Sequence, residues 1–393
     1  MKAAIVLGVC LCLGIAVNAG AQGRANSSRV LVVDDDGAQC HGAQFTTIQS
    51  AIDAASTGDS VHVCDGIYKE TLHIAKNVDV VADSGAFLVP SSIPENTASL
   101  QSGAPIAAAV LVTGTTGVRL FGLTVDGVNS GITGCAPNLI GVYYQNASGH
   151  AERLTIRGFQ LGMGLGGCQS GTGIFVQSGN GGTSRVEIDH CVLHNFQKNG
   201  ITANEVGTDV NIHGNVVNGI GVTTGAAQNG IQIGFGAQGA IRRNTVSNAL
   251  WSPCSADNCA NVGTGILVDE SDNVVIEANR VSHTQIGIFV VGNGGSLDAN
   301  RVNDSQVFDG IRIQGDQNRV HGSRVNTSGE AGIFLQGANN RAVENIITEA
   351  PIGILKTSDS TGAHIQNNTF FSTPVTVQDP PAVDLATKLS PVR

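Results

Sequence analysis

Three four-residue segments in the C-terminal third of the chain decide the fold: Gly287-Ile288-Phe289-Val290, Gly310-Ile311-Arg312-Ile313 and Gly332-Ile333-Phe334-Leu335. Each begins with glycine and isoleucine and places an apolar residue two positions after the isoleucine. The intervals between their glycines are 23 and 22 residues (310 − 287 and 332 − 310). A phrase that returns at a nearly constant interval indicates a solenoid, in which each repeat stacks on the one before.

The same phrase occurs at six further places, with valine in place of isoleucine at Val142 and a lysine in the fourth position at Lys356. From the first glycine to the last, the nine copies are separated by 32, 27, 30, 35, 22, 23, 22 and 21 residues. The early coils are therefore predicted to carry longer loops, above all over residues 129–139, 160–172 and 248–262. The six further copies begin at Gly141, Gly173, Gly200, Gly230, Gly265 and Gly353.

A second phrase, apolar-x-x-Asn-x-apolar, lies between the copies of the first. Asparagine tolerates the left-handed backbone conformation, and its amide can bond to the same residue of a neighbouring coil. We therefore predict an asparagine ladder at a corner between two strands, in which Ser323 and Cys191 take the place of asparagine in two coils. Its asparagines are Asn215, Asn244, Asn279, Asn300, Asn345 and Asn368.

Each interval holds two or three short strands, and none holds a helical pattern long enough for a crossover between parallel strands. Such strands become stable only when successive coils stack at about 4.8 Å and pair in register. The sequence therefore predicts an all-β fold, a right-handed parallel β-helix, over residues 22–373. A leucine-rich repeat of similar period would need a Leu-x-x-Leu-x-Leu frame, which is absent.

The two ends depart from the repeat. Residues 45–55 have apolar side chains at helical spacing, with Thr46 or Thr47 as the cap, and predict a short helix that covers the N-terminal end of the core. Residues 374–393 form a Pro-rich tail, which we interpret as a cover strand or a loose end.

Composition excludes several classes of protein. The chain has 21 Lys and Arg against 31 Asp and Glu, and the net charge of −10 argues against nucleic acid as a partner. A hydrophobic content of 41% excludes a disordered chain. Because aromatic residues make up only 4%, aliphatic side chains must supply most of the core.

The first 21 residues are typical of a cleaved secretory signal peptide. Lys2 precedes an apolar run from Ala3 to Val17, and the small-residue pattern Ala19-Gly20-Ala21 follows. The run is too short to span a bilayer comfortably, and no second apolar segment follows it. We therefore expect a secreted or periplasmic protein with no integral membrane association.

Seven cysteines remain after the signal peptide, and in an oxidising compartment they are expected to pair. A zinc site is the alternative, but no C-x-x-C motif or histidine cluster accompanies these cysteines. Sequence alone does not prove the connectivity. The predicted pairs are Cys40–Cys64, Cys135–Cys168 and Cys254–Cys259.

The chain resembles the pectate-lyase-like superfamily of right-handed parallel β-helix proteins. Residues 45–55 and 61–70 are similar to the opening segment of many secreted members, and residues 141–371 resemble their generic β-helix region. The resemblance implies the fold for nearly the whole mature chain. No subfamily can be assigned, because the architecture serves lyases, hydrolases, esterases, epimerases and adhesins alike. The stretch Val186–Cys191 resembles the Asp-His stretch of pectate lyases, but their later Arg-Pro-Arg motif is absent, and we interpret His190 as a turn residue.

The residue between the two inward positions of each phrase points outward, so successive coils build a flat surface on which a polymer can lie. Aromatic rings there can stack on sugars, while amides and charges can hold hydroxyls and carboxylates. We therefore predict that an extracellular, acidic polysaccharide is the partner. Alternatively, the two phenylalanines pack beneath a long loop, and the tryptophan seals its own loop. The predicted substrate-binding residues are Phe289, Phe334, Gln314, Gln336 and Trp251.

If the protein is an enzyme, lyase chemistry is favoured over hydrolase, esterase or epimerase chemistry. A lyase needs a base beside the uronate carboxylate, and Ca²⁺ or another cation to neutralise that carboxylate. Arg312 is predicted as base or clamp, Asp309 as its orienting group, and Asp269 and Glu270 as Ca²⁺ ligands. Solvated turn charges explain the carboxylates equally well, and the alternative function is a non-catalytic carbohydrate-binding, surface or structural protein.

Overall fold

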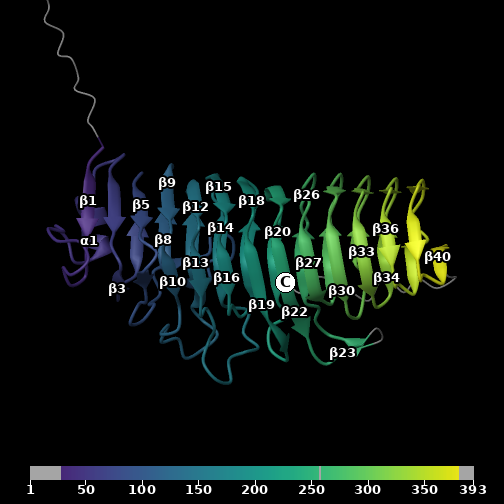
Figure 1. The fold of residues 1–393 in the computed structure, drawn as a ribbon, viewed down its shortest axis with the longest axis horizontal. Helices are drawn as coiled ribbons and strands as arrows, with labels where there is room; N and C mark the ends of the chain where they lie inside the picture. The colour runs from purple at the N-terminus through teal and green to yellow at the C-terminus, as the bar shows by residue number, and fades with distance from the viewer. Residues whose placement is uncertain (1–27, 256–257, 380–393) are drawn as a thin grey trace, which may run out of the picture.

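The structure, a computed structural model, describes residues 28–255 and 258–379. The predicted signal peptide and the tail beyond Asp379 lie outside the described residues. The described chain winds as one row of coils along the long axis of the molecule (Figure 1). Strands of successive coils pair in parallel into three long sheets, here named A, B and C, which confirms the predicted right-handed parallel β-helix.

Sheet A contains thirteen strands within the described residues. In spatial order they are β1 (Val30–Val33), β2 (Ser60–Val63), β5 (Asp79–Ala82), β9 (Val118–Phe121), β12 (Gly149–Glu152), β15 (Ser184–Asp189), β18 (Thr208–His213), β21 (Gln238–Arg242), β26 (Val275–Glu277), β29 (Ser296–Asp298), β32 (Arg319–His321), β35 (Arg341–Val343) and β38 (His364–Gln366).

Sheet B follows the first corner of each coil. Its strands are β3 (Gly66–Tyr68), β6 (Ala86–Leu88), β10 (Thr124–Asp126), β13 (Thr155–Arg157), β16 (Val192–His194), β19 (Val216–Thr223), β22 (Thr245–Trp251), β27 (Arg280–Thr284), β30 (Arg301–Ser305), β33 (Arg324–Ser328), β36 (Ile346–Thr348) and β39 (Thr369–Phe371).

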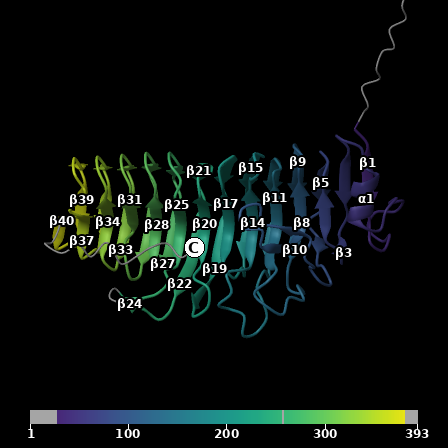
Figure 2. The ribbon, with the colours of Figure 1, turned by 180° about the vertical axis from the view of Figure 1, so that it is seen from behind.

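Sheet C contains the glycine-isoleucine phrase, and Figure 2 shows its strands side by side. They are β4 (Leu72–Ile74), β8 (Pro105–Thr113), β11 (Asn138–Gln145), β14 (Thr172–Gln177), β17 (Asn199–Asn204), β20 (Asn229–Gly234), β25 (Thr264–Asp269), β28 (Ile286–Val291), β31 (Ile311–Gln314), β34 (Ala331–Gln336), β37 (Ile352–Lys356) and β40 (Val375–Gln378). The short strand β7 (Thr97–Ala98) pairs antiparallel with β8, and β23 (Cys254–Ser255) and β24 (Asn258–Cys259) form a separate hairpin. Strand β40 belongs to the Pro-rich tail and lies in register on β37.

The predicted capping helix is α1 (Ile48–Ala54). The Thr47 hydroxyl accepts a hydrogen bond from the Ser50 amide, and the Glu70 carboxylate accepts from the amides of Ile48 and Gln49 at 2.7 and 2.9 Å. These acceptors satisfy amides that the first turn of a helix leaves unpaired. Ile48, Ala51 and Ile52 are buried, so the apolar face of the helix closes the N-terminal end of the core.

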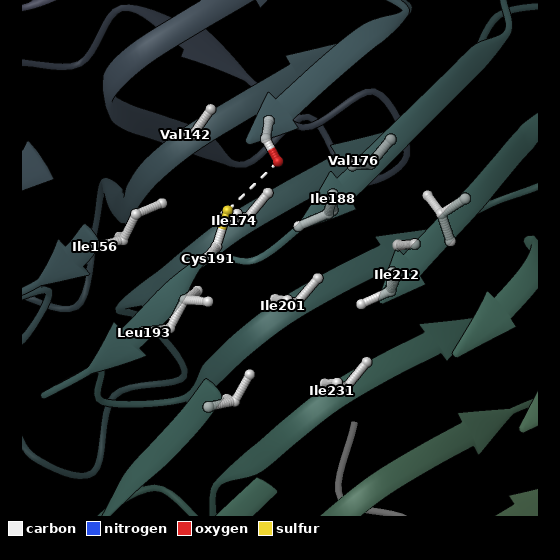
Figure 3. Close-up of a cluster of buried hydrophobic side chains, with 14 of the residues drawn as sticks. Val142, Ile156, Ile174, Val176, Ile188, Cys191, Leu193, Ile201, Ile212 and Ile231 are labelled. Carbon is white, nitrogen blue, oxygen red and sulfur yellow. Dashed lines mark hydrogen bonds between the residues drawn. The ribbon is translucent and has the colours of Figure 1, made fainter. Parts of the chain in front are cut away.

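The interior is a set of aliphatic stacks. Ile174, Ile201 and Ile231 pair in register on three successive strands of sheet C and point into the core (Figure 3). Each buried isoleucine contributes roughly 1.5–3 kcal/mol relative to an exposed one. The repeated glycine leaves room for this packing, because a Cβ added at Gly287 would overlap Cγ1 of Val302 and the carbonyl oxygen of Gly310.

The asparagine ladder is confirmed. The side-chain amide of Asn215 donates to Asn244, that of Asn244 to Asn279, and that of Asn279 to Asn300, at 2.9 to 3.0 Å. The Ser323 hydroxyl accepts from the Asn300 amide in the next coil. These side chains are buried, so each rung satisfies polar groups that would otherwise be costly to bury.

All three predicted disulfides are present, Cys40–Cys64, Cys135–Cys168 and Cys254–Cys259. The remaining described cysteine, Cys191, lies in the core with its thiol against the Ala151 carbonyl oxygen. Six of the seven described cysteines are therefore disulfide-bonded, and a zinc site at Cys40, His62 and Cys64, whose side chains lie close together, would require the Cys40–Cys64 disulfide to be reduced. The one described helix, α1, is too short to cross a bilayer.

Candidate functional site

The outward face of sheet C carries the predicted surface. The registers place one residue from each coil in a single column along this face, and the residue two positions later forms a parallel column. From β14 to β37 the first column reads Phe175, Thr202, Gln232, Leu267, Phe289, Arg312, Phe334 and Leu355. Its chemistry therefore changes from polar in the middle of the sheet to mostly apolar at the C-terminal end.

A hollow of about 190 Å³ lies over the polar part, and we call it the floor hollow. Strands β14, β17, β20 and β25 form its base, so four consecutive coils supply its side chains. Its lining residues are Gln169, Thr172, Phe175, Lys198, Asn199, Thr202, Asn204, Gln232, Phe235 and Asp269.

A chain of amides orders the base of the floor hollow. Asn199 Nδ2 donates to Thr202 Oγ1 at 2.9 Å and to Gln232 Oε1 at 3.1 Å. Gln232 Nε2 donates to Asn204 Oδ1 at 3.2 Å. The other amide atom, Asn199 Oδ1, is buried and has no hydrogen-bond partner among the described residues. A buried acceptor without a donor is costly, so a side-chain rotation that turned this oxygen toward the hollow would let it accept from a ligand hydroxyl or N–H group.

Lys198 brings a cation into the same hollow although it is only 8% exposed. Its ammonium donates to the Ala227 carbonyl oxygen at 3.0 Å, the one bond of Nζ among the described residues. An ammonium has three donors, so it can bind a further acceptor. Burial lowers the pKa of Lys198 to about 8, because desolvation disfavours the charged form.

An aromatic surface borders the hollow at its N-terminal side. The ring of Phe175 stacks on that of Tyr143, with centroids 5.1 Å apart and planes 9° from parallel. The Tyr143 hydroxyl donates to Gln177 Oε1 at 2.6 Å, which fixes its ring. Phe175 and Phe235 are both partly exposed and both line the hollow, so two rings are available for stacking on sugars.

A second hollow of about 800 Å³, the edge hollow, adjoins the first at Phe235. It follows the turns that leave sheet C, and burial raises the pKa of its Glu205 carboxyl. The two hollows share Phe235 as a lining residue, and we call them together the groove. The edge hollow is lined by Gln101, Ser178, Gly179, Asn180, Gly181, Glu205, Val206, Phe235 and Glu270.

Long loops precede strands of sheet C in the early coils, as the long early intervals predict (Figure 1). These loops are linked to one another. The Cys135–Cys168 disulfide joins the first two loops. The Ala226 amide donates to the Gly166 carbonyl at 2.7 Å, and the Trp251 indole donates to the Gly225 carbonyl at 2.9 Å. Trp251 therefore holds two loops together and is absent from the lining of both hollows, which matches the loop-seal alternative.

Arg312 and Asp309, the predicted catalytic pair, lie at the C-terminal end of sheet C and are 3% and 0% exposed. Arg312 Nε donates to Asp309 Oδ2 at 2.6 Å, and Arg312 Nη2 lies 3.3 Å from Glu330 Oε2. The guanidinium also lies 4.2 Å from the centre of the Phe334 ring. Arg312 and Asp309 thus lie together, as expected. Both side chains, however, are enclosed by other described residues.

The predicted aromatic binding residues are buried as well. Phe289 packs with Leu267, Ile286 and Phe308, and Cys254, Cys259 and Val262 of the disulfide-bonded loop pack against this cluster. Phe334 packs with Leu355 and Ala331. The positions of Phe289 and Phe334 therefore agree with the alternative in which these rings are covered by other residues, and neither ring lines the groove.

Of the remaining predicted residues, some lie toward the C-terminal end of sheet C and others lie in the groove. Gln314 and Gln336 pair in register on β31 and β34, beyond the hollows. Asp269 lines the floor hollow, whereas Glu270 lines the edge hollow. Four described groups of His, Cys, Asp or Glu are close enough together to hold a metal ion, and none includes either acid. Two carboxylates on different hollows offer few of the six to eight oxygens that Ca²⁺ takes.

Sequence reasoning missed Lys198, Asn199 and Phe235. Lys198 could have been recognised from the position two residues before the repeated glycine. Aligned from Gly173 to Gly353, this position holds Gly, Lys, Gln, Gly, Gln, Phe, Glu and Pro, so Lys198 is its single cation. The residue before the glycine is polar in the coils of the groove, at Thr172, Asn199 and Asn229, and mostly apolar later.

Solved structures with the same architecture match most of the chain at low identity. The surface adhesin PfbA of Streptococcus pneumoniae aligns with a TM-score of 0.60 and 13% identity, covering 84% of this chain and 88% of that chain. A GH136 lacto-N-biosidase from Eubacterium ramulus gives 0.53 and 12%, covering 87% and 68%. DFA-IIIase from Arthrobacter chlorophenolicus A6, in complex with GF2, gives 0.51 and 15%, covering 86% and 87%. At this identity the likeness shows the fold.

A family model described as periplasmic copper-binding protein (NosD) matches residues 252–385, about a third of the chain. The four described candidate metal clusters all lie before residue 252 and thus outside this match. No curated protein matches the sequence.

Proposed function

We propose, since the chain is a right-handed parallel β-helix protein, that it is exported and binds an extracellular polysaccharide in the groove on sheet C. The single observation that carries this proposal is the floor hollow, in which amides from consecutive coils, two aromatic rings and a buried lysine converge. Three disulfides suit the oxidising environment of the periplasm or the cell exterior. Similar structures include a glycosidase and an adhesin, which supports a carbohydrate or cell-surface role for this architecture.

The stacked coils favour a polymer over a small molecule. Equivalent side chains recur about every 4.8 Å along the sheet, and the groove spans four coils. Several sugar units can therefore contact Thr202, Gln232 and the aromatic rings at the same time. Ordered amides are well suited to hydroxyl groups because each can donate and accept.

An acidic polymer is favoured by Lys198. Lys198 lines the floor hollow and is only 8% exposed, and low solvent access strengthens the attraction of an ammonium for a carboxylate. The neighbouring acceptor Asn199 Oδ1 would bind a hydroxyl of the same sugar. A uronic acid residue offers both groups.

Lyase chemistry is a second candidate function, supported by the lowered pKa of Lys198. A lysine with a pKa of about 8 has a neutral fraction near neutral pH that can accept a proton. In β-elimination the neutral amine would take the proton from C5, beside the uronate carboxyl group, the C–H electron pair would form the C4–C5 double bond, and the C4–O bond would break. The departing sugar oxygen would take a proton from water or from the lysine ammonium so formed. In this proposal Lys198 takes the role first predicted for Arg312. Ca²⁺ at Asp269 or Glu270 stays a prediction, which chelation would test.

Affinity electrophoresis tests the binding proposal, with polygalacturonate and alginate as acidic polymers and xylan and inulin as neutral ones. We expect the wild type to be retarded by an acidic polymer. Lys198→Gln should bind at least about tenfold more weakly, because it loses a charge-assisted hydrogen bond. Lys356→Gln is the control, since Lys356 also lies on a strand of sheet C, β37, but is outside the lining of both hollows and pairs with Asp379 at 2.6 Å.

Retardation by no polymer, or equal affinity of wild type and Lys198→Gln for the acidic polymers, would contradict the proposal. Absorbance of the unsaturated product separates binding from cleavage. A lyase would generate it with the wild type and lose it in Lys198→Gln, whereas a binding protein would generate none with either.

A further inference from the structure

A histidine-rich cluster lies on sheet A, away from the groove, and it does not depend on the proposed function. Strands β12, β15 and β18 follow one another along this sheet (Figure 1). Their registers place His150 opposite Glu187, and Asp189 opposite both Glu152 and His213. His190 follows Asp189 at the corner, where its backbone is left-handed at φ 52°. Three histidines and three carboxylates from three coils thus meet on one outward face.

Asp189 is the centre of this cluster. Its carboxylate bonds to His190 Nδ1 at 2.6 Å through one oxygen and to His150 Nε2 through the other. The side chain of Asp189 is only 10% exposed, and its described partners are imidazoles. A divalent cation bound by these side chains would neutralise the largely buried Asp189 carboxylate.

The geometry points to a site for a first-row divalent transition-metal ion such as Zn²⁺, with Asp189, His190 and His213 as its ligands. One ligand atom of each residue lies within 4.8 Å of the others. Ligands of one tetrahedral zinc ion lie about 3.4 Å apart, given bonds of about 2.0–2.1 Å, so small side-chain rotations would complete the site. Imidazole nitrogen with one carboxylate oxygen suits this class of ion and not Ca²⁺ or Mg²⁺.

The neighbouring groups distinguish this triad from the other one in the cluster. Glu152 Oε2 is held by Arg119 at 2.7 Å, so the alternative set of His150, Glu152 and Asp189 already contains a paired carboxylate. His213 Nε2 bonds to Glu187 Oε1 at 2.8 Å. A carboxylate on one ring nitrogen orients a histidine so that its other nitrogen can bind a metal, and Glu187 is therefore a positioning residue.

The site is open to solvent. The His190 side chain is 60% exposed and that of His213 is 26% exposed, so an ion could enter without unfolding. Three protein ligands leave coordination positions for water or an external ligand. The next cation along the sheet is Arg242. Its guanidinium bonds to Glu277 and Asn211 and is therefore directed away from His213.

Isothermal titration calorimetry with ZnCl₂ on the tag-free, chelator-treated full-length protein tests the assignment, together with metal analysis after dialysis. We expect one bound Zn²⁺ per chain that millimolar CaCl₂ does not displace. His190→Ala and His213→Ala should each weaken binding at least about tenfold, and Glu187→Gln about tenfold or more. His190 is largely exposed, so His190→Ala is expected to keep the fold, which circular dichroism checks.

His321→Ala is the matched control on the same sheet. His321 lies between Asp298 and Glu344 in a similar arrangement, but there Arg319 supplies the positive charge. This variant should bind Zn²⁺ like the wild type. Absence of stoichiometric binding, displacement of Zn²⁺ by Ca²⁺, or unchanged affinity in both His190→Ala and His213→Ala would overturn the assignment. Polysaccharide binding by these variants should be unchanged, so this result and that of the groove experiment are independent.

Discussion

The middle and the C-terminal end of sheet C have the same backbone but opposite surfaces. Over β14 to β25 the outward column is half polar, with Thr202 and Gln232 between Phe175 and Leu267, and Lys198 joins these polar side chains in an open hollow. Over β28 to β37 the same outward column holds Phe289, Arg312, Phe334 and Leu355, and each of these residues is at most 8% exposed. Both regions contain one buried cation, yet Arg312 is enclosed by Asp309, Glu330 and Phe334 whereas Lys198 has one carbonyl partner among the described residues.

This difference teaches that a repeat fixes where side chains point but not what covers them. The glycine-isoleucine phrase sets the inward stack identically in both regions. The outward positions depend on the loops, which leave a depression over the early coils and pack against Phe289 in the later ones. A cation paired on all sides contributes to stability, and one with free donors in a hollow is suited to binding.

The largest expected effect is on stability and comes from Arg312. Arg312→Ala leaves the fully buried Asp309 carboxylate without its ion pair and removes the stacking on Phe334. Loss of one partner of a buried pair typically costs about 3–5 kcal/mol, so urea denaturation should show a decrease of that size in the free energy of unfolding. Polysaccharide affinity of the folded variant should stay within about twofold.

Arg301→Ala is the control, because Arg301 is exposed on sheet B and should change the free energy of unfolding by no more than about 0.5 kcal/mol. If Arg312→Ala were as stable as the wild type but lost polysaccharide binding or cleavage, the assignment of the two regions would be reversed.

A smaller effect is expected from pH. The ammonium of Lys198 has a pKa of about 8, below its ordinary value of 10.5, so at pH 9 roughly one molecule in ten retains the charge. Affinity for an acidic polymer should therefore fall by up to about tenfold between pH 7 and pH 9. Turnover by a lyase would instead rise through pH 8, because the neutral amine is the base.

The same shift has a defined sign for stability. Between pH 8 and 10.5 the unfolded chain binds more protons at Lys198 than the folded chain does, so this residue makes stability rise with pH over that window. Lys198→Gln should remove both the fall in affinity between pH 7 and pH 9 and the contribution that makes stability rise between pH 8 and 10.5. An equal decline of affinity in wild type and Lys198→Gln would show that another group titrates.

The fold followed from the sequence because a solenoid is nearly one-dimensional. Residues at equal positions in the phrase become neighbours, so the stack of Ile174, Ile201 and Ile231 and the ladder from Asn215 could be predicted without knowledge of the loops. The three disulfides also followed, since each joins cysteines close in sequence or on adjacent loops. The outward direction of Phe289, Arg312 and Phe334 was predicted for the same reason.

The site could not be predicted to the same extent. Whether Phe289 is exposed depends on the loop over residues 251–262, whose conformation is not part of the repeat. Lys198 precedes its strand, and its reach into the floor hollow depends on the Ala227 carbonyl in the next loop. The sequence indicated only a turn residue at His190, because His150 and His213 are distant in sequence and meet Asp189 only through strand pairing.

The most direct test of the account compares two glutamines on the outward face of sheet C, Gln232 in the groove and Gln314 in the C-terminal region. Affinity electrophoresis of Gln232→Ala and Gln314→Ala should be run against the acidic polymer that retards the wild type most. Loss of the Gln232 hydrogen bonds should weaken binding about fivefold, equivalent to about 1 kcal/mol, whereas Gln314→Ala should bind within about twofold of the wild type. Weaker binding by Gln314→Ala than by Gln232→Ala would contradict the placement of the polysaccharide over the middle of the sheet.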